Sequence, residues 1–244
     1  MNKLGVKYWD CWARSSEREL RDAILRGHSG KEEFDEAGRI DAEHLVLPFI
    51  TQGDIVADIG CGVGRIMRWV APHCSEIYGF DISKEMLGQA RKHLSDIKNA
   101  HFAKIPLSLK LSIKSSFLDF AYFYHVSEHL RREDTVQMLN EIRRCLRPRG
   151  KALLEFSLIN HADNQKEFRR WMNSCDVEGV RSRFYTESEV EVILSMVQFY
   201  PQMRLYIPGE FVVVVSKKSN NVLGSMPLVK LPCTVNGDGL ENLD

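Results

Sequence analysis

The sequence has no excess of charge of either sign. It contains 33 Lys and Arg residues and 33 Asp and Glu residues, so its formal net charge is zero. A protein that binds nucleic acid in general carries a basic excess. This balance argues against a nucleic-acid partner, although it leaves room for a local basic patch.

Cysteine pairs and long apolar runs are also missing. None of the six cysteines belongs to a Cys-x-x-Cys pair, so nothing in the sequence indicates a metal site or a disulfide framework. The N-terminus is not followed by the apolar core of a signal peptide, and no run approaches the length of a membrane span. We therefore expect a reduced, cytoplasmic setting with no membrane partner.

The stretch 55–66 organises the rest of the chain. Its first part, Ile55 to Ile59, is a short apolar run with β-branched residues, which is typical of a strand buried on both faces. Glycines follow at alternate positions, Gly60, Gly62 and Gly64, before a segment that suits a helix packed on a sheet. Glycine lets a ligand approach the backbone closely, and a helix N-terminus attracts negative charge. The expected guest carries a carboxylate or a phosphate.

The glycine spacing and the next strand narrow the choice of guest. Gly-x-Gly-x-Gly differs from the Gly-x-Gly-x-x-Gly of dinucleotide-binding folds, which disfavours an NAD-dependent oxidoreductase. The next strand ends in Asp81, seventeen residues after Gly64, close to the spacing of about 20 for an acid that binds ribose. Such a carboxylate can accept hydrogen bonds from both ribose hydroxyls.

Two motifs together resemble a known family. Residues 56–65 and 79–83 resemble motifs I and II of the class I S-adenosylmethionine-dependent methyltransferases, of the type 11/12 kind. The alternative is a glycine turn in another α/β protein. The resemblance covers roughly residues 37–217 and implies S-adenosylmethionine as cofactor. It also implies an α/β, Rossmann-like fold, with a central seven-stranded, mostly parallel sheet, an antiparallel strand 7 and helices on both faces.

The chain is expected to divide into three parts. Residues 1–50 form amphipathic helices, which in such methyltransferases often cover the cofactor and shape the substrate cleft. Residues 51–218 form the cofactor-binding domain, where repeated strand–helix units imply right-handed crossovers. Residues 160–185 interrupt that rhythm and are expected to be an insertion near the substrate. The tail 219–244 has little periodicity and is expected to be mobile or loosely docked.

Turn and capping signals set the expected element boundaries. The expected strands are 55–60, 76–81, 100–103, 117–124, 151–158, 199–207 and 210–216, and the expected helices are 64–72, 83–96, 134–146 and 186–196. Ser83 is a good N-cap, and residues 186–189 form a capping box. Pro148-Arg-Gly150 is expected to end the helix before it.

The resemblance also implies a set of cofactor contacts. Asp58 would support the glycine turn or the cofactor amino group, and Tyr124 would lie beside the cofactor. Arg39 could reach the cofactor carboxylate, although a solvent-exposed helix arginine is an equally good interpretation. The full expected set is Asp58, Gly60, Cys61, Gly62, Gly64, Arg39, Asp81, Ile82, Met86 and Tyr124.

One position departs from the family pattern. After strand three the family usually has an acid followed by a Leu-Pro pair, and the acid contacts the adenine amino group. Here Lys104 stands in place of the acid, whereas Pro106 is kept. A lysine cannot accept a hydrogen bond, so a backbone carbonyl or another side chain would have to do so.

The end of the fourth strand carries the candidate catalytic residues. Residues 119–130 resemble motif IV, where the strand end faces the transferred methyl group. His125 and His129 are the titratable groups expected nearest the reaction, and histidine can act as a general base near neutral pH. Many relatives keep such a histidine for structural reasons. Of the two, His129 is the stronger candidate.

The leading hypothesis is methyl transfer from S-adenosylmethionine to oxygen or nitrogen of a small or carrier-linked metabolite. One alternative is a non-catalytic cofactor-binding or regulatory protein on the same fold, for which Lys104 is the best support. A methyltransferase that acts on protein or RNA is another. Fold alone does not fix the substrate.

Overall fold

The computed structural model describes residues 3–25, 30–172, 182–217 and 227–230. Residues 173–181 of the expected insertion and most of the expected tail lie outside these residues. The statements below concern the described part of the chain.

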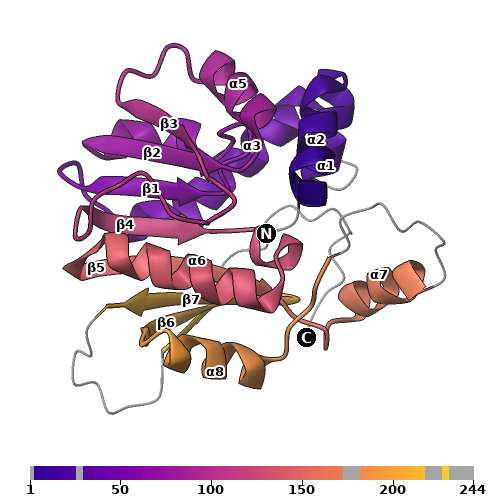
Figure 1. Cartoon of the computed structure of the whole chain (residues 1–244), viewed down its shortest axis with the longest axis vertical. Coiled ribbons are helices and arrows are strands. Elements are labelled where there is room, and N and C mark those ends of the chain that lie inside the picture. Colours follow the sequence, from indigo (N-terminus) through magenta and orange to yellow (C-terminus); the bar gives the residue numbers. More distant parts are fainter. Residues whose placement is uncertain (1–2, 26–29, 173–181, 218–226, 231–244) are drawn as a thin grey trace.

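A mixed sheet forms the centre of the molecule (Figure 1). Its strands are β1 (Ile55–Ile59), β2 (Glu76–Asp81), β3 (Ala100–Lys104), β4 (Leu118–Phe123), β5 (Leu146–Ser157), β6 (Tyr200–Ile207), β7 (Glu210–Ser216) and β8 (Leu228–Lys230). Their order is β3-β2-β1-β4-β5-β7-β6-β8. Strands β1 to β5 run parallel to one another, whereas β7 runs antiparallel to β5 and β6. This confirms the fold class that the sequence predicted.

The sheet has eight strands in the described residues, where the sequence predicted seven. The additional strand, β8, pairs parallel with β6 through only three residues. It comes from the segment 219–244. A three-residue strand is too short to show an alternating pattern in the sequence. Its formation depends instead on its pairing with β6.

Helices cover both faces of the sheet. They are α1 (Lys3–Arg14), α2 (Glu17–Leu25), α3 (Lys31–Asp41), α4 (Met67–Val70), α5 (Lys84–His93), α6 (Arg132–Cys145), α7 (Ala162–Met172) and α8 (Glu187–Met196). Shorter helical turns are Ala42–Val46, Leu47–Phe49, Ala71–His73 and Ser127–His129. Among the described residues, no helix combines the length and apolarity that crossing a membrane requires.

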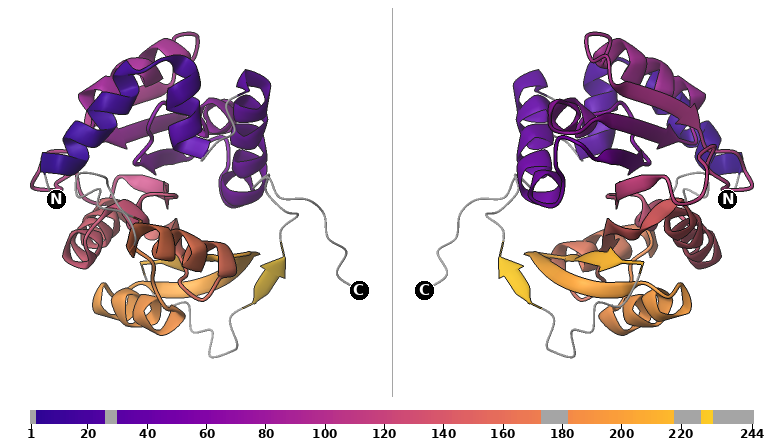
Figure 2. Two further views of the ribbon diagram at one scale, coloured as in Figure 1. Left: turned by 90° about the vertical axis from the view of Figure 1, so that its right-hand side faces the viewer. Right: turned by 90° about the vertical axis from the view of Figure 1, so that its left-hand side faces the viewer.

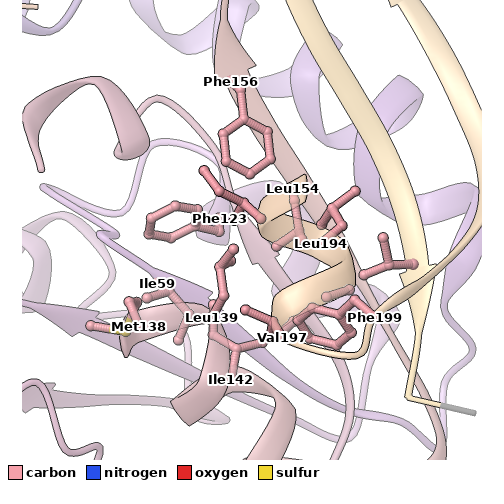
Figure 3. Packing of buried hydrophobic residues seen from close by; sticks show 14 of the residues in the cluster. Ile59, Phe123, Met138, Leu139, Ile142, Leu154, Phe156, Leu194, Val197 and Phe199 are labelled. Carbon is pink, nitrogen blue, oxygen red and sulfur yellow. The ribbon is translucent and has the colours of Figure 1, made fainter. Parts of the chain in front are cut away.

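Alternation along the strands builds a hydrophobic core on each face, because successive side chains point to opposite sides of a sheet. Helices α6 and α8 pack on one face, where Leu139 and Leu194 gather with Phe123 and Phe156 (Figure 3). On the other face, residues 42–46, α4 and α5 pack against the alternate strand positions. Both faces of the sheet are therefore covered, and a ligand can reach it only at the ends of the strands.

Several boundaries follow from local signals, and one expectation is wrong. The Ser83 hydroxyl accepts a hydrogen bond from the Met86 amide, and the Thr186 hydroxyl accepts one from the Glu189 amide, which confirms both caps. Residues 148–150 do not separate α6 from a later strand. They lie inside β5, where Leu118 pairs with residue 146 and Phe120 with residue 151. The extra residues of β5 form an irregularity in its pairing with β4. This irregularity accommodates Pro148, which has no backbone N–H to donate.

The expected helix 64–72 is also shorter in the structure. Gly62 and Gly64 have φ of 53° and 80°, outside the right-handed helical region. The glycine turn therefore runs on to residue 66, and α4 begins at Met67.

The first three helices form a separate layer. Figures 1 and 2 show α1, α2 and α3 gathered in the half of the molecule that holds β1, β2 and β3. A third hydrophobic cluster joins them to the glycine turn and to α5, and its buried members are Ala13, Leu20, Phe34, Val63 and Met86. The Ser83 hydroxyl also donates to the Asp10 carboxylate, at 2.5 Å. Helix α1 is thus attached directly beside the end of β2.

Candidate active site

The glycine turn is held by the neighbouring strand and needs its glycines for different reasons. The amides of Gly60 and Cys61 donate to the Phe80 carbonyl, at 2.7 and 3.0 Å. A Cβ on Gly60 would meet Val126 Cγ2 at 2.3 Å, whereas a Cβ on Gly62 would meet no atom within 4 Å. Gly60 therefore allows close packing, and Gly62 borders the open space in which a ligand can approach the backbone.

Asp81 joins this turn to the end of β2. Its Oδ2 accepts a hydrogen bond from the Gly62 amide at 3.0 Å, and its Oδ1 accepts one from the Ser83 amide at 2.8 Å. A carboxylate has about four acceptor positions, so capacity remains for two ribose hydroxyls. Burial raises the pKa of Asp81 to about 6, although these amides favour the charged form. The carboxylate is therefore ionised at pH 8.

Asp58 lies at the other side of the turn, buried within β1. Burial raises its pKa to about 8, and the nearby charge of Asp81 adds to the shift. At pH 7 the ligand-free protein therefore holds Asp58 mostly protonated. A cation placed beside it, such as an ammonium group, would favour the charged form. Burial also raises the pKa of the Cys61 thiol, so Cys61 is a packing residue of the turn and not a nucleophile.

The segment after β4 lies against the glycine turn through the contact between Val126 and Gly60. Tyr124 is buried there, and burial raises its pKa, with the charge of Glu210 adding to the shift. The ring of His125 lies 4.1 Å from that of Tyr124, measured between centroids. The family-implied donor site and the first candidate base thus meet at one edge of the sheet.

His129 lies in the short turn that follows. Its Nε2 is 3.3 Å from Glu128 Oε1, and its ring packs edge-on against Trp9 of α1 at 5.1 Å between centroids. Glu128 is buried, and its other oxygen accepts a hydrogen bond from the Ser157 hydroxyl at 2.8 Å. A carboxylate in this position orients an imidazole and stabilises its protonated form. The arrangement suits a general base.

Three expected cofactor contacts have other partners or lie beside the turn without a contact that assigns them to the cofactor. Arg39 lies on α3 and forms ion pairs with Glu36 and Glu43. Met86 is buried in the cluster under the first three helices, and Ile82 is half-buried beside Asp81. Cofactor contacts from Arg39, Met86 and Ile82 therefore stay predictions.

Sequence reasoning missed a second arginine. Arg65 follows the glycine turn directly, is buried, and pairs with Asp41 of α3 at 2.6 Å. A Cβ on Gly38 would meet the Arg65 carbonyl at 2.6 Å, so α3 packs closely on this residue. The available signal was its position next to the third glycine. Lys104 is exposed, and its Cα is the register partner of Asp81.

Two buried glutamates were missed as well. Glu155 lies near the end of β5 and Glu210 begins β7. The signal was an acid inside an otherwise apolar strand, because burying a carboxylate is costly unless it is paired or binds a cation.

Comparisons with known proteins agree with this geometry. The family model described as "Methyltransferase domain" matches residues 57–154. Phosphoethanolamine N-methyltransferase 2 of Caenorhabditis elegans is 25% identical over 122 residues, which are 49% of this chain and 28% of that protein. The carboxy-S-adenosyl-L-methionine synthase of Actinobacillus pleuropneumoniae serotype 5b is 27% identical over 133 residues, 50% of this chain and 53% of that protein. The chain thus matches about half or less of these relatives' lengths.

A solved structure shows the same fold. The magnesium protoporphyrin IX methyltransferase of Synechocystis PCC 6803, solved with bound S-adenosylhomocysteine, superposes with a TM-score of 0.61. The match covers 89% of this chain and 96% of that one at 18% identity. The matched family segment runs from β1 into β5 and includes both the glycine turn and Asp81. By these comparisons, residues 57–154 match a methyltransferase domain, and the chain has the fold of solved methyltransferases that use S-adenosylmethionine.

Proposed function

We propose that the protein transfers a methyl group from S-adenosylmethionine to oxygen or nitrogen of a small or carrier-linked metabolite. The observation that carries the proposal is the contact between Gly60 and Val126. It supports the proposal because the glycine turn, the candidate donor site, lies beside the segment that holds the candidate bases His125 and His129. The class of methyl acceptor is part of this proposal, because the matched relatives are distant.

The side chains divide the work. The cofactor supplies an activated methyl group, so the protein mainly positions the reactants. Asp81 would hold the ribose and Asp58 the amino group, while Gly62 leaves room for the ligand. His129 would take the acceptor proton as the new bond forms. Helix α1, which contacts both Ser83 and His129, would cover the site.

Asp81 provides the first test of the cofactor site. Replacing Asp81 by Ala should weaken S-adenosylhomocysteine binding by about 1.5–3 kcal/mol, the range for hydrogen bonds to a charged group, which is at least about tenfold in affinity. Titration calorimetry at pH 8 measures the effect. Asp96→Ala is the matched control, because Asp96 is an exposed partner of Arg68.

Two outcomes would oppose the assignment. Wild-type affinity in a folded Asp81→Ala protein would remove Asp81 from the cofactor site. NADH that binds more tightly than S-adenosylhomocysteine would favour the oxidoreductase alternative.

The raised pKa of Asp58 predicts that cofactor binding releases a proton. Its pKa of about 8 in the ligand-free protein means that it is mostly protonated at pH 7. An ammonium group bound beside it would lower that pKa, so binding should release a proton at pH 7 and strengthen as the pH rises toward 8. Calorimetry at pH 7 in two buffers of different ionisation enthalpy measures the release. Asp58→Asn should abolish the release; equal enthalpies in both buffers for the wild type would show that Asp58 does not contact the amino group.

The acceptor class needs a separate experiment. Incubating the protein with methyl-labelled cofactor and separated cell fractions distinguishes metabolite, protein and RNA acceptors. Label in the metabolite fraction supports the proposal, and label in protein or RNA redirects it. No transfer to any fraction, despite cofactor binding, would favour the non-catalytic alternative that Lys104 suggests.

A further inference from the structure

Three potential metal ligands meet beside the proposed acceptor site. The histidine–glutamate cluster consists of His125, Glu155 and Glu210, and one ligand atom from each lies within 4.8 Å of the other two. The three residues come from three different elements: His125 follows β4, Glu155 lies near the end of β5, and Glu210 begins β7. Their approach is therefore a product of the sheet and not of sequence proximity.

Strand directions explain why they meet. Strands β4 and β5 are parallel and end at the same edge, whereas β7 is antiparallel and begins there. Glu210 pairs with Ser157 in the β5–β7 register. Glu155 is two residues before Ser157 and so points to the same face. The two glutamates are diagonal neighbours on that face, within reach of long side chains.

The cluster combines buried acids with an accessible nitrogen ligand. Glu155 is 0% exposed and Glu210 is 8% exposed, whereas the His125 side chain is 39% exposed. Its Nε2 lies 3.9 Å from Glu210 Oε1. A ligand can therefore reach the cluster from the side of His125.

Neighbouring groups fix the orientation of Glu155. Its Oε2 accepts a hydrogen bond from the His125 backbone amide at 3.1 Å, and its Oε1 lies 3.2 Å from the Ser157 hydroxyl, which shares its one proton between Glu155 and Glu128. Outer hydrogen bonds of this kind hold the carboxylate ligands of metal sites in place.

We propose that His125, Glu155 and Glu210 bind one divalent first-row cation, such as Mn²⁺ or Zn²⁺. An imidazole suits the later metals of this row and carboxylates suit Mn²⁺. Ligand atoms at bonds of about 2.0–2.2 Å to one ion lie at most about 4.4 Å apart. The cluster, at 4.8 Å, needs only a small side-chain movement to close on an ion.

Three protein ligands leave coordination positions for another molecule. If the proposed function holds, an acceptor hydroxyl could occupy one of them, and a bound cation would lower the pKa of that hydroxyl. The hydroxyl proton would pass to His129, the oxygen would form a bond to the methyl carbon, and the carbon–sulfur bond would break. The products would be a methyl ether and S-adenosylhomocysteine. The metal site thus favours an oxygen acceptor over a nitrogen acceptor.

Metal titration tests the site without requiring an acceptor. We expect tag-free protein to bind one Mn²⁺ per chain, seen as loss of the free Mn²⁺ signal in electron paramagnetic resonance, with Zn²⁺ as a second probe by calorimetry. Glu210→Gln and His125→Asn should each weaken binding by at least about tenfold. Asn is chosen because residue 125 has φ of 55°, which Asn tolerates.

A matched control and an independent readout make the test decisive. His101→Asn removes an exposed histidine that pairs with Glu76 and should leave metal binding unchanged. Affinity for S-adenosylhomocysteine should be unchanged in Glu210→Gln and His101→Asn, so failure of the metal site and failure of the cofactor site are distinguishable.

Absence of Mn²⁺ and Zn²⁺ binding by the wild type at millimolar metal would overturn the proposal. The proposal would also be overturned if either folded variant, Glu210→Gln or His125→Asn, bound the metal as tightly as the wild type. Each variant is tested separately.

Discussion

A Gly60→Ala variant is expected to be about 2–5 kcal/mol less stable than the wild type. The added methyl group would lie 2.3 Å from Val126 Cγ2, and inserting such a group into a packed core costs about 1–3 kcal/mol. Gly60 also has φ of 88°, and a left-handed backbone costs a residue with a Cβ about 1–2 kcal/mol. Urea unfolding followed by circular dichroism gives the free energy of unfolding.

Gly62→Ala is the matched comparison. Gly62 has φ of 53°, but a Cβ there meets open space, so only the backbone cost of about 1–2 kcal/mol applies. Its main effect should instead be weaker binding of S-adenosylhomocysteine, and the larger Gly62→Val should bind more weakly still. Adding Val126→Ala to Gly60→Ala should recover part of the lost stability. Equal losses in the two alanine variants would mean that the Val126 contact does not set the requirement for glycine.

His129→Ala is expected to lower turnover by at least about 10²-fold, the lower end of the range for loss of a general base. Cofactor affinity should stay nearly unchanged, because no residue of the glycine turn is altered. Single-turnover kinetics with the acceptor found in the labelled-cofactor screen measure the effect.

The control must separate chemistry from packing. The His129 ring packs on Trp9, and such a pair is worth about 0.5–1.5 kcal/mol. A purely structural histidine would show this loss of stability, with turnover falling only in parallel. His101→Ala, which removes an exposed ring, should change neither quantity. Full activity in folded His129→Ala protein would leave positioning as the mechanism, with the proton passing to water or another group.

The elements that the sequence predicted correctly are those with local causes. The β1 strand depends on a continuous apolar run, and the N-cap at Ser83 on a hydroxyl next to the first helical turn. The glycine turn and Asp81 belong to two motifs a fixed distance apart, and the structure joins them through the Gly62 amide. Each motif is itself only a few residues long, and the separation between the two motifs is fixed, so one sequence suffices to find them.

The features that the sequence did not predict depend on register and packing. Glu155 and Glu210 approach each other only because β7 runs antiparallel to β5 with Ser157 opposite Glu210. The buried pair of Arg65 and Asp41 depends on how α3 packs on the turn. Neither arrangement leaves a periodic pattern along the chain, since each joins residues that are distant in sequence.

Helix α1 has two neighbouring residues that contact different segments of the candidate site. Asp10 accepts a hydrogen bond from Ser83, beside the cofactor motif, while Trp9 packs on the candidate base His129. Successive residues are only about 1.5 Å apart along a helix axis, so the two contacts lie at nearly the same position along α1. A displacement of α1 would therefore break both contacts together. Exchange of the spent cofactor and exchange of the acceptor would therefore share one gate, which would couple the timing of the two events.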